Sequence, residues 1–257
     1  MEPRAVSAGH GWTWIAQGYT LFRRSPAVWA ALILILFVAA KVLLSIPLLG
    51  ILFVLLMPLF LVGLMEGCRT LEHGGTLQPT HLLCGFRHNA AHLATIGGIS
   101  LVGNILVMMI VMQVGGEAIT SLSKTMAANT PPSPELAQQT QAAAREVARA
   151  LLIGTAVSLP LLMALWYAPL LIYFDDLGPL AAMKASFVAC TRNVPAMFVY
   201  GLLIIAGMFL AMPVSMALRQ YDLSLWLLAP VVVPSIYASY RDLFPAPIAP
   251  VEPDAAP

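Results

Sequence analysis

Between residues 27 and 65 the chain reads AVWAALILILFVAAKVLLSIPLLGILFVLLMPLFLVGLM, and Lys41 is the one charged residue in this stretch. A helix of about 20 apolar residues is long enough to cross the hydrocarbon core of a bilayer. The stretch has nearly twice that length, and proline and glycine within 45–50 favour a turn near its middle. We therefore interpret it as two membrane spans, at about 26–46 and 50–66. A re-entrant hairpin is the alternative interpretation.

The composition of the whole chain agrees with this interpretation. Of the 257 residues, 60% are hydrophobic and 10% are charged, whereas soluble domains have roughly 45–50% and 25%. A net charge of +1 gives no electrostatic surface for nucleic acid. The composition therefore predicts an all-α integral membrane protein, and it excludes a disordered chain and a nucleic-acid-binding protein.

Further windows without charged residues complete the predicted membrane domain. The remaining spans are expected at about 94–115, 150–174, 195–218 and 223–240. Six spans make residues 1–244 one polytopic membrane domain. The Pro- and Ala-rich tail at 245–257 is expected to be disordered.

The distribution of basic residues predicts the orientation of the chain. Six spans put both termini on one side, which holds eight of the Lys and Arg residues, whereas the other side holds five. Cytoplasmic segments carry the excess of Lys and Arg. Cys68, Cys84 and Cys190 fall on the same richer side, as expected where thiols stay reduced. We therefore expect an inner membrane protein with both termini in the cytoplasm.

Three segments that precede predicted spans share one pattern, in which apolar residues at helical spacing lead to an arginine-marked bend. Their apolar stripes are Trp12, Ile15, Tyr19 and Phe22; Leu82, Leu83, Phe86, Ala90 and Leu93; and Leu180, Met183, Phe187 and Cys190. Interruption of the stripes by polar residues is typical of helices that lie in the membrane interface. The pattern predicts three cytoplasmic interfacial helices and a threefold repeat of interfacial helix, bend and two-span hairpin. The alternative is that these are ordinary amphipathic linkers.

The arginines at the three bends are the candidate site residues. Arg23, Arg87 and Arg192 occupy equivalent positions in a gapless alignment of the bends. A guanidinium group at headgroup depth can pair with lipid phosphate, so these arginines are candidate lipid-headgroup contacts.

A metal site and a catalytic site are weaker hypotheses. The side chains of His81, Cys84, His88 and His92 would share one face of a helix, and imidazole and thiolate suit zinc or copper. They would spread over roughly 16 Å, so a polar interfacial face is the favoured interpretation and we expect no metal. The catalytic hypothesis concerns the adjacent carboxylates of Asp175 and Asp176. We expect these two groups instead to be solvated, or to pair with Lys184 or Arg192.

Polar and small residues inside the spans leave two further questions open. A transport path would use groups such as Asn104 beside broken helices. Gly63-xxx-Gly67 and Gly154-xxx-Ser158 fit close helix packing, either within the chain or at a dimer face. Glu66 and Arg69 are three residues apart and are expected to pair.

Four stretches resemble known proteins. They are Gly11-Trp12-Thr13-Trp14-Ile15 with Leu21-Phe22-Arg23; Gly63 to Arg69; Tyr167-Ala168-Pro169 through Asp175 to Ala185-Ser186-Phe187 and Arg192-Asn193; and Ser235 to Asp242. Together they resemble a family of uncharacterised multi-pass membrane proteins of bacteria. The wider pattern is similar to the membrane domain that precedes the catalytic domain in some glycerophosphodiester phosphodiesterases. The resemblance covers most of residues 11–244 and implies no activity, because this sequence lacks the phosphodiesterase active site.

No soluble catalytic domain fits anywhere in the sequence. We therefore expect no enzymatic activity and no cofactor. The predicted role is structural, accessory or lipid-interacting, with membrane lipids as partners and a homo-oligomer as a further candidate assembly. A transporter or channel-like protein for a small molecule is the alternative.

Overall fold

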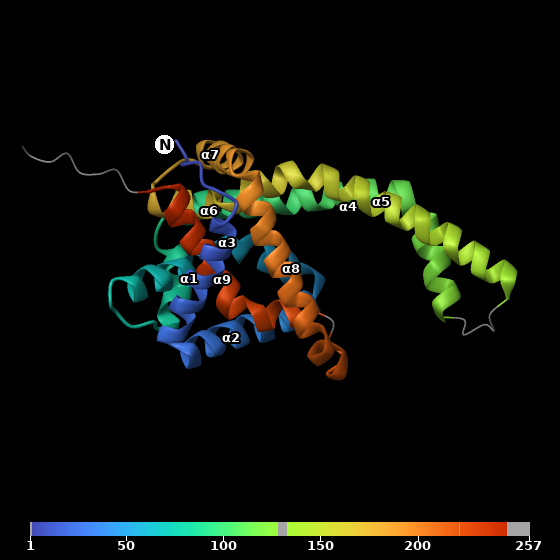
Figure 1. The fold of residues 1–257 in the computed structure, drawn as a ribbon, viewed down its shortest axis with the longest axis horizontal. Helices are drawn as coiled ribbons and strands as arrows, with labels where there is room; N and C mark the ends of the chain where they lie inside the picture. Colours follow the sequence, from blue (N-terminus) through green and yellow to red (C-terminus); the bar gives the residue numbers. More distant parts are fainter. Residues whose placement is uncertain (1, 128–132, 221, 246–257) are drawn as a thin grey trace, which may run out of the picture.

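The structure is a computed structural model that describes residues 2–127, 133–220 and 222–245, which form a bundle of helices (Figure 1). Six helical segments are long and apolar enough to cross a membrane. They are α2 (Pro26–Leu44), α3 (Pro47–Glu72), α4 (Ala90–Ala127), α5 with its continuation α6 (Pro134–Trp166 and Ala168–Phe174), α8 (Val194–Ala217) and α9 (Leu223–Leu243). The prediction of an all-α membrane protein with six spans is confirmed. The predicted tail lies outside the described residues beyond residue 245.

The stretch that decided the fold forms two helices rather than the short arms of a re-entrant hairpin. Helix α2 has 19 residues and α3 has 26, so each is long enough to cross the bilayer by itself. Proline stands at the first position of both helices, where its missing N–H group has no helical partner.

The first and last residues that the structure describes lie at the same end of the bundle, which we call the termini end (residues 2–24, 66–92, 175–194 and 241–245). The backbone N–H of Arg4 donates to the carbonyl of Leu243 at 2.8 Å, and His88 lies 2.8 Å from Asp176. At the opposite end Lys41 pairs with Asp222 at 2.7 Å and joins the α2–α3 turn to the α8–α9 turn. The hydrogen bond from Lys41 lowers the pKa of Asp222.

Two of the three predicted amphipathic helices are present at the termini end. They are α1 (His10–Arg24) and α7 (Pro179–Arg192). The buried face of α7 consists of small residues such as Ala182 and Ala189, whereas that of α1 combines Gly11 and Gly18 with the large side chains of Trp14 and Leu21. Within the predicted stripes, Trp12 is 62% exposed and Leu180 is 81% exposed, whereas Ile15, Phe22 and Met183 pack partly buried against the core.

The prediction of a second amphipathic helix, over residues 82–93, is wrong. Residues Pro79–Phe86 form the short 3-10 helix η1, and α4 begins only at Ala90. Between them Asn89 adopts a left-handed backbone with φ of 54°, which interrupts a right-handed helix. The apolar periodicity of residues 82–93 therefore spans two separate elements and the bend between them. The threefold repeat is not confirmed, because its second copy differs in structure from the other two.

The small residues in α3 and α5 pack within the chain. A Cβ atom on Gly63 would lie 2.4 Å from the carbonyl oxygen of His81, so η1 lies directly on this face of α3. A Cβ atom on Gly154 would lie 2.4 Å from Val111 of α4. The interpretation of these motifs as a dimer face is therefore wrong. Association of copies through other faces stays a prediction.

The fourth span is broken between α5 and α6, and a side chain repairs the break. Pro169 has no N–H group and cannot continue the helical ladder. The hydroxyl of Ser186 in α7 accepts a hydrogen bond from the N–H of Tyr167 at 3.0 Å and donates to the carbonyl of Met163 at 2.7 Å. In a continuous helix these two backbone groups would bond each other. Ser186 is fully buried and so replaces the lost backbone bond.

Replacing Ser186 with alanine should lower stability by about 1–3 kcal/mol, because a buried N–H and a buried carbonyl lose their partner. The measurement is unfolding of the purified protein in mild detergent. The control is Ser158→Ala, since the Ser158 hydroxyl donates only to Thr155 of its own helix. Equal stability of the two variants would contradict the assigned role of Ser186.

Candidate functional site

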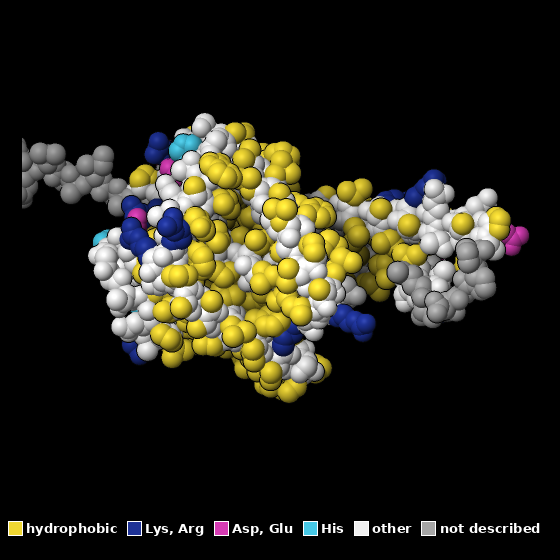
Figure 2. All heavy atoms as spheres, turned by 60° about the horizontal axis from the view of Figure 1, so that its bottom comes forward, with side chains coloured by type: hydrophobic (Ala, Val, Ile, Leu, Met, Phe, Trp, Pro, Cys, Tyr) yellow, Lys and Arg dark blue, Asp and Glu magenta, His cyan; other side chains and the backbone are white. Residues whose placement is uncertain are grey.

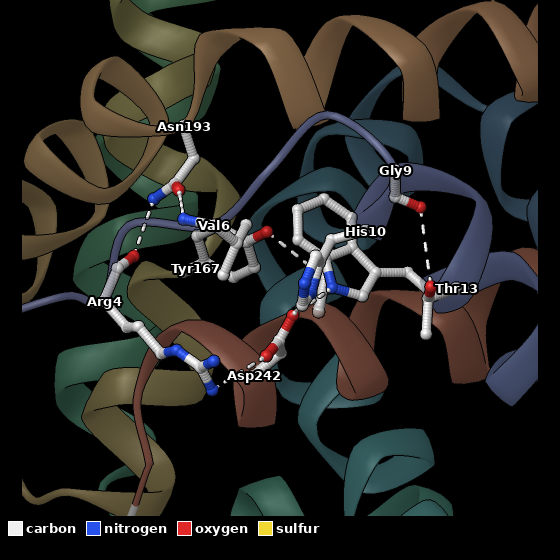
Figure 3. Close-up of polar contacts among 10 residues, drawn as sticks. Arg4, Val6, Gly9, His10, Thr13, Tyr167, Asn193 and Asp242 are labelled. Atoms are coloured by element: carbon white, nitrogen blue, oxygen red, sulfur yellow. Dashed lines mark hydrogen bonds and ion pairs between the residues drawn. The ribbon is translucent and has the colours of Figure 1, made fainter.

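Polar side chains from distant parts of the sequence meet at the termini end around Asp242, near the end of α9 (Figure 3). The Asp242 carboxylate accepts a hydrogen bond from the indole N–H of Trp14 at 2.8 Å and lies 2.6 Å from Nδ1 of His10. The guanidinium of Arg4 lies 3.7 Å from the other carboxylate oxygen of Asp242. Asp242 thus joins α9 to the start of α1 and to the segment that precedes it.

Asn193 holds the same N-terminal segment from the other side (Figure 3). Its side-chain amide donates to the carbonyls of Arg4 and Ala189, each at 2.9 Å, and its oxygen accepts from the N–H of Val6 at 2.8 Å. Asn193 lies at the bend between α7 and α8 and is fully buried. Residues 4–6 are therefore fixed across this bend.

The acidic pair that follows α6 has partners other than those expected. Asp175 accepts a hydrogen bond from the hydroxyl of Tyr240 at 2.6 Å, and its partial burial raises its pKa. Asp176 accepts from the side-chain amide of Asn89 at 2.8 Å, and bonds from Asn89 and His88 lower its pKa.

The expected pairing of this acidic pair with Lys184 or Arg192 is wrong. The end of α7 directs Arg192 toward the N-terminal segment, where it contacts Glu2 and the carbonyl of Pro3.

A polar cleft of about 390 Å³ opens beside this network, between α1, the end of α3 and the last turns of α9. Glu72 forms part of its wall, where it accepts a hydrogen bond from Tyr237 at 2.9 Å and pairs with Arg241. We call it the α1–α9 cleft, and its lining residues are His10, Thr13, Gln17, Thr20, Leu21, Arg24, Glu72, Tyr237, Ala238, Arg241 and Asp242.

A second depression is apolar and lies between the spanning helices α5 and α8. It has a volume of about 480 Å³ and is lined almost entirely by carbon and sulfur atoms. We call it the α5–α8 groove. Its walls include Leu162, Trp166, Phe198, Tyr200 and Gly201.

The three arginines singled out in the sequence are exposed, and each lies just before a spanning helix. Arg23 lies over the ring of Tyr19, with 5.8 Å between its guanidinium carbon and the ring centre. None of the three lines the α1–α9 cleft. Their contact with lipid headgroups stays a prediction.

Sequence reasoning missed the cleft residue Arg24, although a signal for it was present. Thr13, Gln17, Thr20 and Arg24 recur at spacings of 4, 3 and 4 residues, which places them on one face of α1. The apolar stripe drew attention to a different face of the same helix.

The residues considered for a metal do not share a helix face. The bend at Asn89 separates His81 and Cys84 on η1 from His92 on α4. Among the residues that the structure describes, no group of three His, Cys, Asp or Glu side chains could hold a metal ion.

The remaining sequence candidates lie apart from both depressions. Asn104 is exposed on α4, where its amide donates to the carbonyl of Ser100 at 2.7 Å. Glu66 and Arg69 pair at 2.9 Å, as expected.

Comparisons with known proteins identify a curated relative. No family model and no solved structure matches the chain. A curated protein of Burkholderia thailandensis, described as a probable inner membrane protein, is 32% identical over 264 aligned residues, which cover 95% of this chain and 94% of the relative. The similarity to the membrane domain of glycerophosphodiester phosphodiesterases stays a prediction. Because the match extends over nearly all of both sequences, the chain belongs to the family of this probable inner membrane protein.

Proposed function

We propose that the protein is a non-enzymatic, lipid-interacting accessory protein of the inner membrane, with both termini in the cytoplasm. The observation that carries this proposal is the α5–α8 groove. An apolar groove between two spanning helices opens onto lipid, and an acyl chain is the occupant whose chemistry matches its walls.

The course of the helices supports this occupant. In Figure 1 the α4–α5 pair runs away from α8 and extends beyond the rest of the bundle. In the apolar 18-residue window of α8, only 6% of the residues are buried by the rest of the protein. Hydrophobic side chains cover much of the face in Figure 2. Lipid chains are the available material to fill the space.

The exposed arginines complete the proposed lipid contact. Arg23, Arg87 and Arg192 lie at the termini end, just before the helices that enter the membrane. At this depth their guanidinium groups would pair with the phosphates of the surrounding lipids.

Filling the groove should reduce lipid retention. A Cβ atom on Gly201 would meet no atom within 4 Å, so Gly201→Leu places a side chain in the groove without a backbone clash. Native mass spectrometry of the protein in mild detergent should show at least one fewer retained phospholipid than in the wild type.

The control for this variant is Leu210→Phe, at a residue of α8 that is 83% exposed and lies outside the groove lining. It changes the lipid-facing surface and leaves the groove open. Unchanged lipid retention in Gly201→Leu, or an equal loss in both variants, would contradict the proposal.

The cytoplasmic location of the termini is tested by cysteine labelling with a membrane-impermeant maleimide. Cys68 and Cys190 are buried and should stay unreactive in the folded protein, so introduced cysteines are needed in a Cys84→Ser background. Thr76 at the termini end and Gln139 in α5 are both exposed. In intact spheroplasts Gln139→Cys should react at once, whereas Thr76→Cys should react only after the membrane is permeabilised. The reverse pattern would mean that the orientation is inverted.

A further inference from the structure

Helix α1 carries a polar face along the α1–α9 cleft. Thr13, Gln17, Thr20 and Arg24 form this face, and at 1.5 Å per residue it extends over roughly 16 Å. Exposed Trp12 and Tyr19 lie on a second face, and buried Gly11 and Gly18 lie on a third. The polar face is thus distinct from both the buried face and the exposed apolar face of α1.

The acidic groups of the cleft are already paired within the protein. Asp242 is held by Trp14, His10 and Arg4. Glu72 is held by Tyr237 and by Arg241, whose charge it balances. These carboxylates therefore form the walls of the cleft, and their negative charges are balanced by their own partners. Any charge available to a ligand must come from another residue of the lining.

Arg24 supplies a positive charge that is available to a ligand. Among the described residues its guanidinium has one hydrogen-bond partner, the neutral carbonyl of Leu71, and no carboxylate within ion-pair distance. A guanidinium has five N–H donors, so most of them are available to a ligand. The contact with Leu71 ties Arg24 to the end of α3 and so restricts the position of its charge.

Neutral polar groups continue from Arg24 along the cleft. The hydroxyl of Thr20 donates to the carbonyl of Ala16 at 2.9 Å, which leaves its oxygen as an acceptor. The side-chain amide of Gln17 makes no hydrogen bond to the residues that the structure describes, and it offers both donors and an acceptor. A ligand that fits this face combines one anionic group with hydroxyl groups beside it.

We propose that the α1–α9 cleft binds a phosphate ester with a hydroxylated substituent, with its phosphate on Arg24 and its hydroxyl groups along Thr20 and Gln17. Arginine matches the geometry of phosphate oxygens with parallel N–H donors. A cleft of about 390 Å³ accommodates a glycerol phosphate and not merely the anion.

Two sources can present this chemistry, a lipid headgroup and a soluble phosphate ester. Arg24 is the last residue of α1, directly before the bend into the spanning helix α2, where lipid phosphates are present. If the phosphate belongs to a lipid, the inference rests on the lipid-interacting role proposed above. The cleft and the α5–α8 groove share no lining residue, so the two proposals can fail separately.

The test is equilibrium binding to the purified full-length protein in detergent, with glycerol 1-phosphate as the soluble probe and a short-chain phosphatidylglycerol as the lipid probe. A short-chain diacylglycerol, which lacks phosphate, is the negative control ligand. The wild type should bind at least one of the phosphate probes saturably and should not bind the diacylglycerol. Binding of the lipid alone identifies a headgroup site, whereas binding of glycerol 1-phosphate shows that the ester itself is recognised.

Arg24→Gln should weaken this binding about tenfold or more, because it removes a charge-assisted hydrogen bond. The matched control is Lys184→Gln, which removes one positive charge from an exposed residue of α7 at the same end of the protein, outside the cleft lining. It should change the affinity less than about twofold, since a charge-assisted bond is lost only in the first variant. Gln17→Leu is a second cleft variant at an exposed position; it should also weaken binding, and it decides the test if Arg24→Gln does not fold.

Three results would overturn the inference. Neither phosphate probe binds saturably, Lys184→Gln weakens binding as much as Arg24→Gln, or the diacylglycerol binds as well as the phosphatidylglycerol. Gly201→Leu separates this inference from the groove proposal, because it should reduce retained lipid and leave glycerol 1-phosphate binding intact.

Discussion

The close contact of α1 with α9 positions most of the polar end of the molecule. A Cβ atom on Gly18 would lie 2.6 Å from the backbone nitrogen of Ser235, so only glycine lets the two helices approach this far. At this separation the indole of Trp14 is fully buried and reaches Asp242. The same approach places the polar face of α1 beside Tyr237 and Arg241 and so creates the α1–α9 cleft.

Hydrocarbon imposes a second constraint, because polar groups within the bilayer must find partners inside the protein. Hydroxyl groups in the spans meet in pairs, such as Tyr200 with Ser235 at 2.6 Å and Ser215 with Ser224 at 3.1 Å. Ser186 satisfies the same demand at the break in the fourth span. Of the eight ion pairs among the described residues, six lie at the termini end. Of the other two, Lys41–Asp222 joins two turns at the opposite end, and Arg149–Glu146 lies on α5.

These constraints explain what the sequence could predict. Spans are set by charge-free windows, which are local, so all six were predictable. The second interfacial helix was predicted wrongly because periodicity does not reveal the left-handed backbone at Asn89. The site depends on distant contacts: Trp14 and Asp242 are 228 positions apart. The spacing of the polar face of α1 is present in the sequence and was missed, whereas no local pattern indicates which residues form the opposite wall of the cleft.

One aromatic contact, made by Trp14 of α1, connects the two depressions. Helix α1 is therefore part of the packed bundle. Tyr200 lines the α5–α8 groove, and its ring packs edge-on against Trp14 with 5.6 Å between ring centres. Trp14 in turn donates to Asp242, which lines the α1–α9 cleft. A helix that merely rested on the membrane surface would need no buried tryptophan. Helix α1 is instead built into the bundle, between the apolar α5–α8 groove and the α1–α9 cleft, whose Arg24 has no ion-pair partner among the residues that the structure describes.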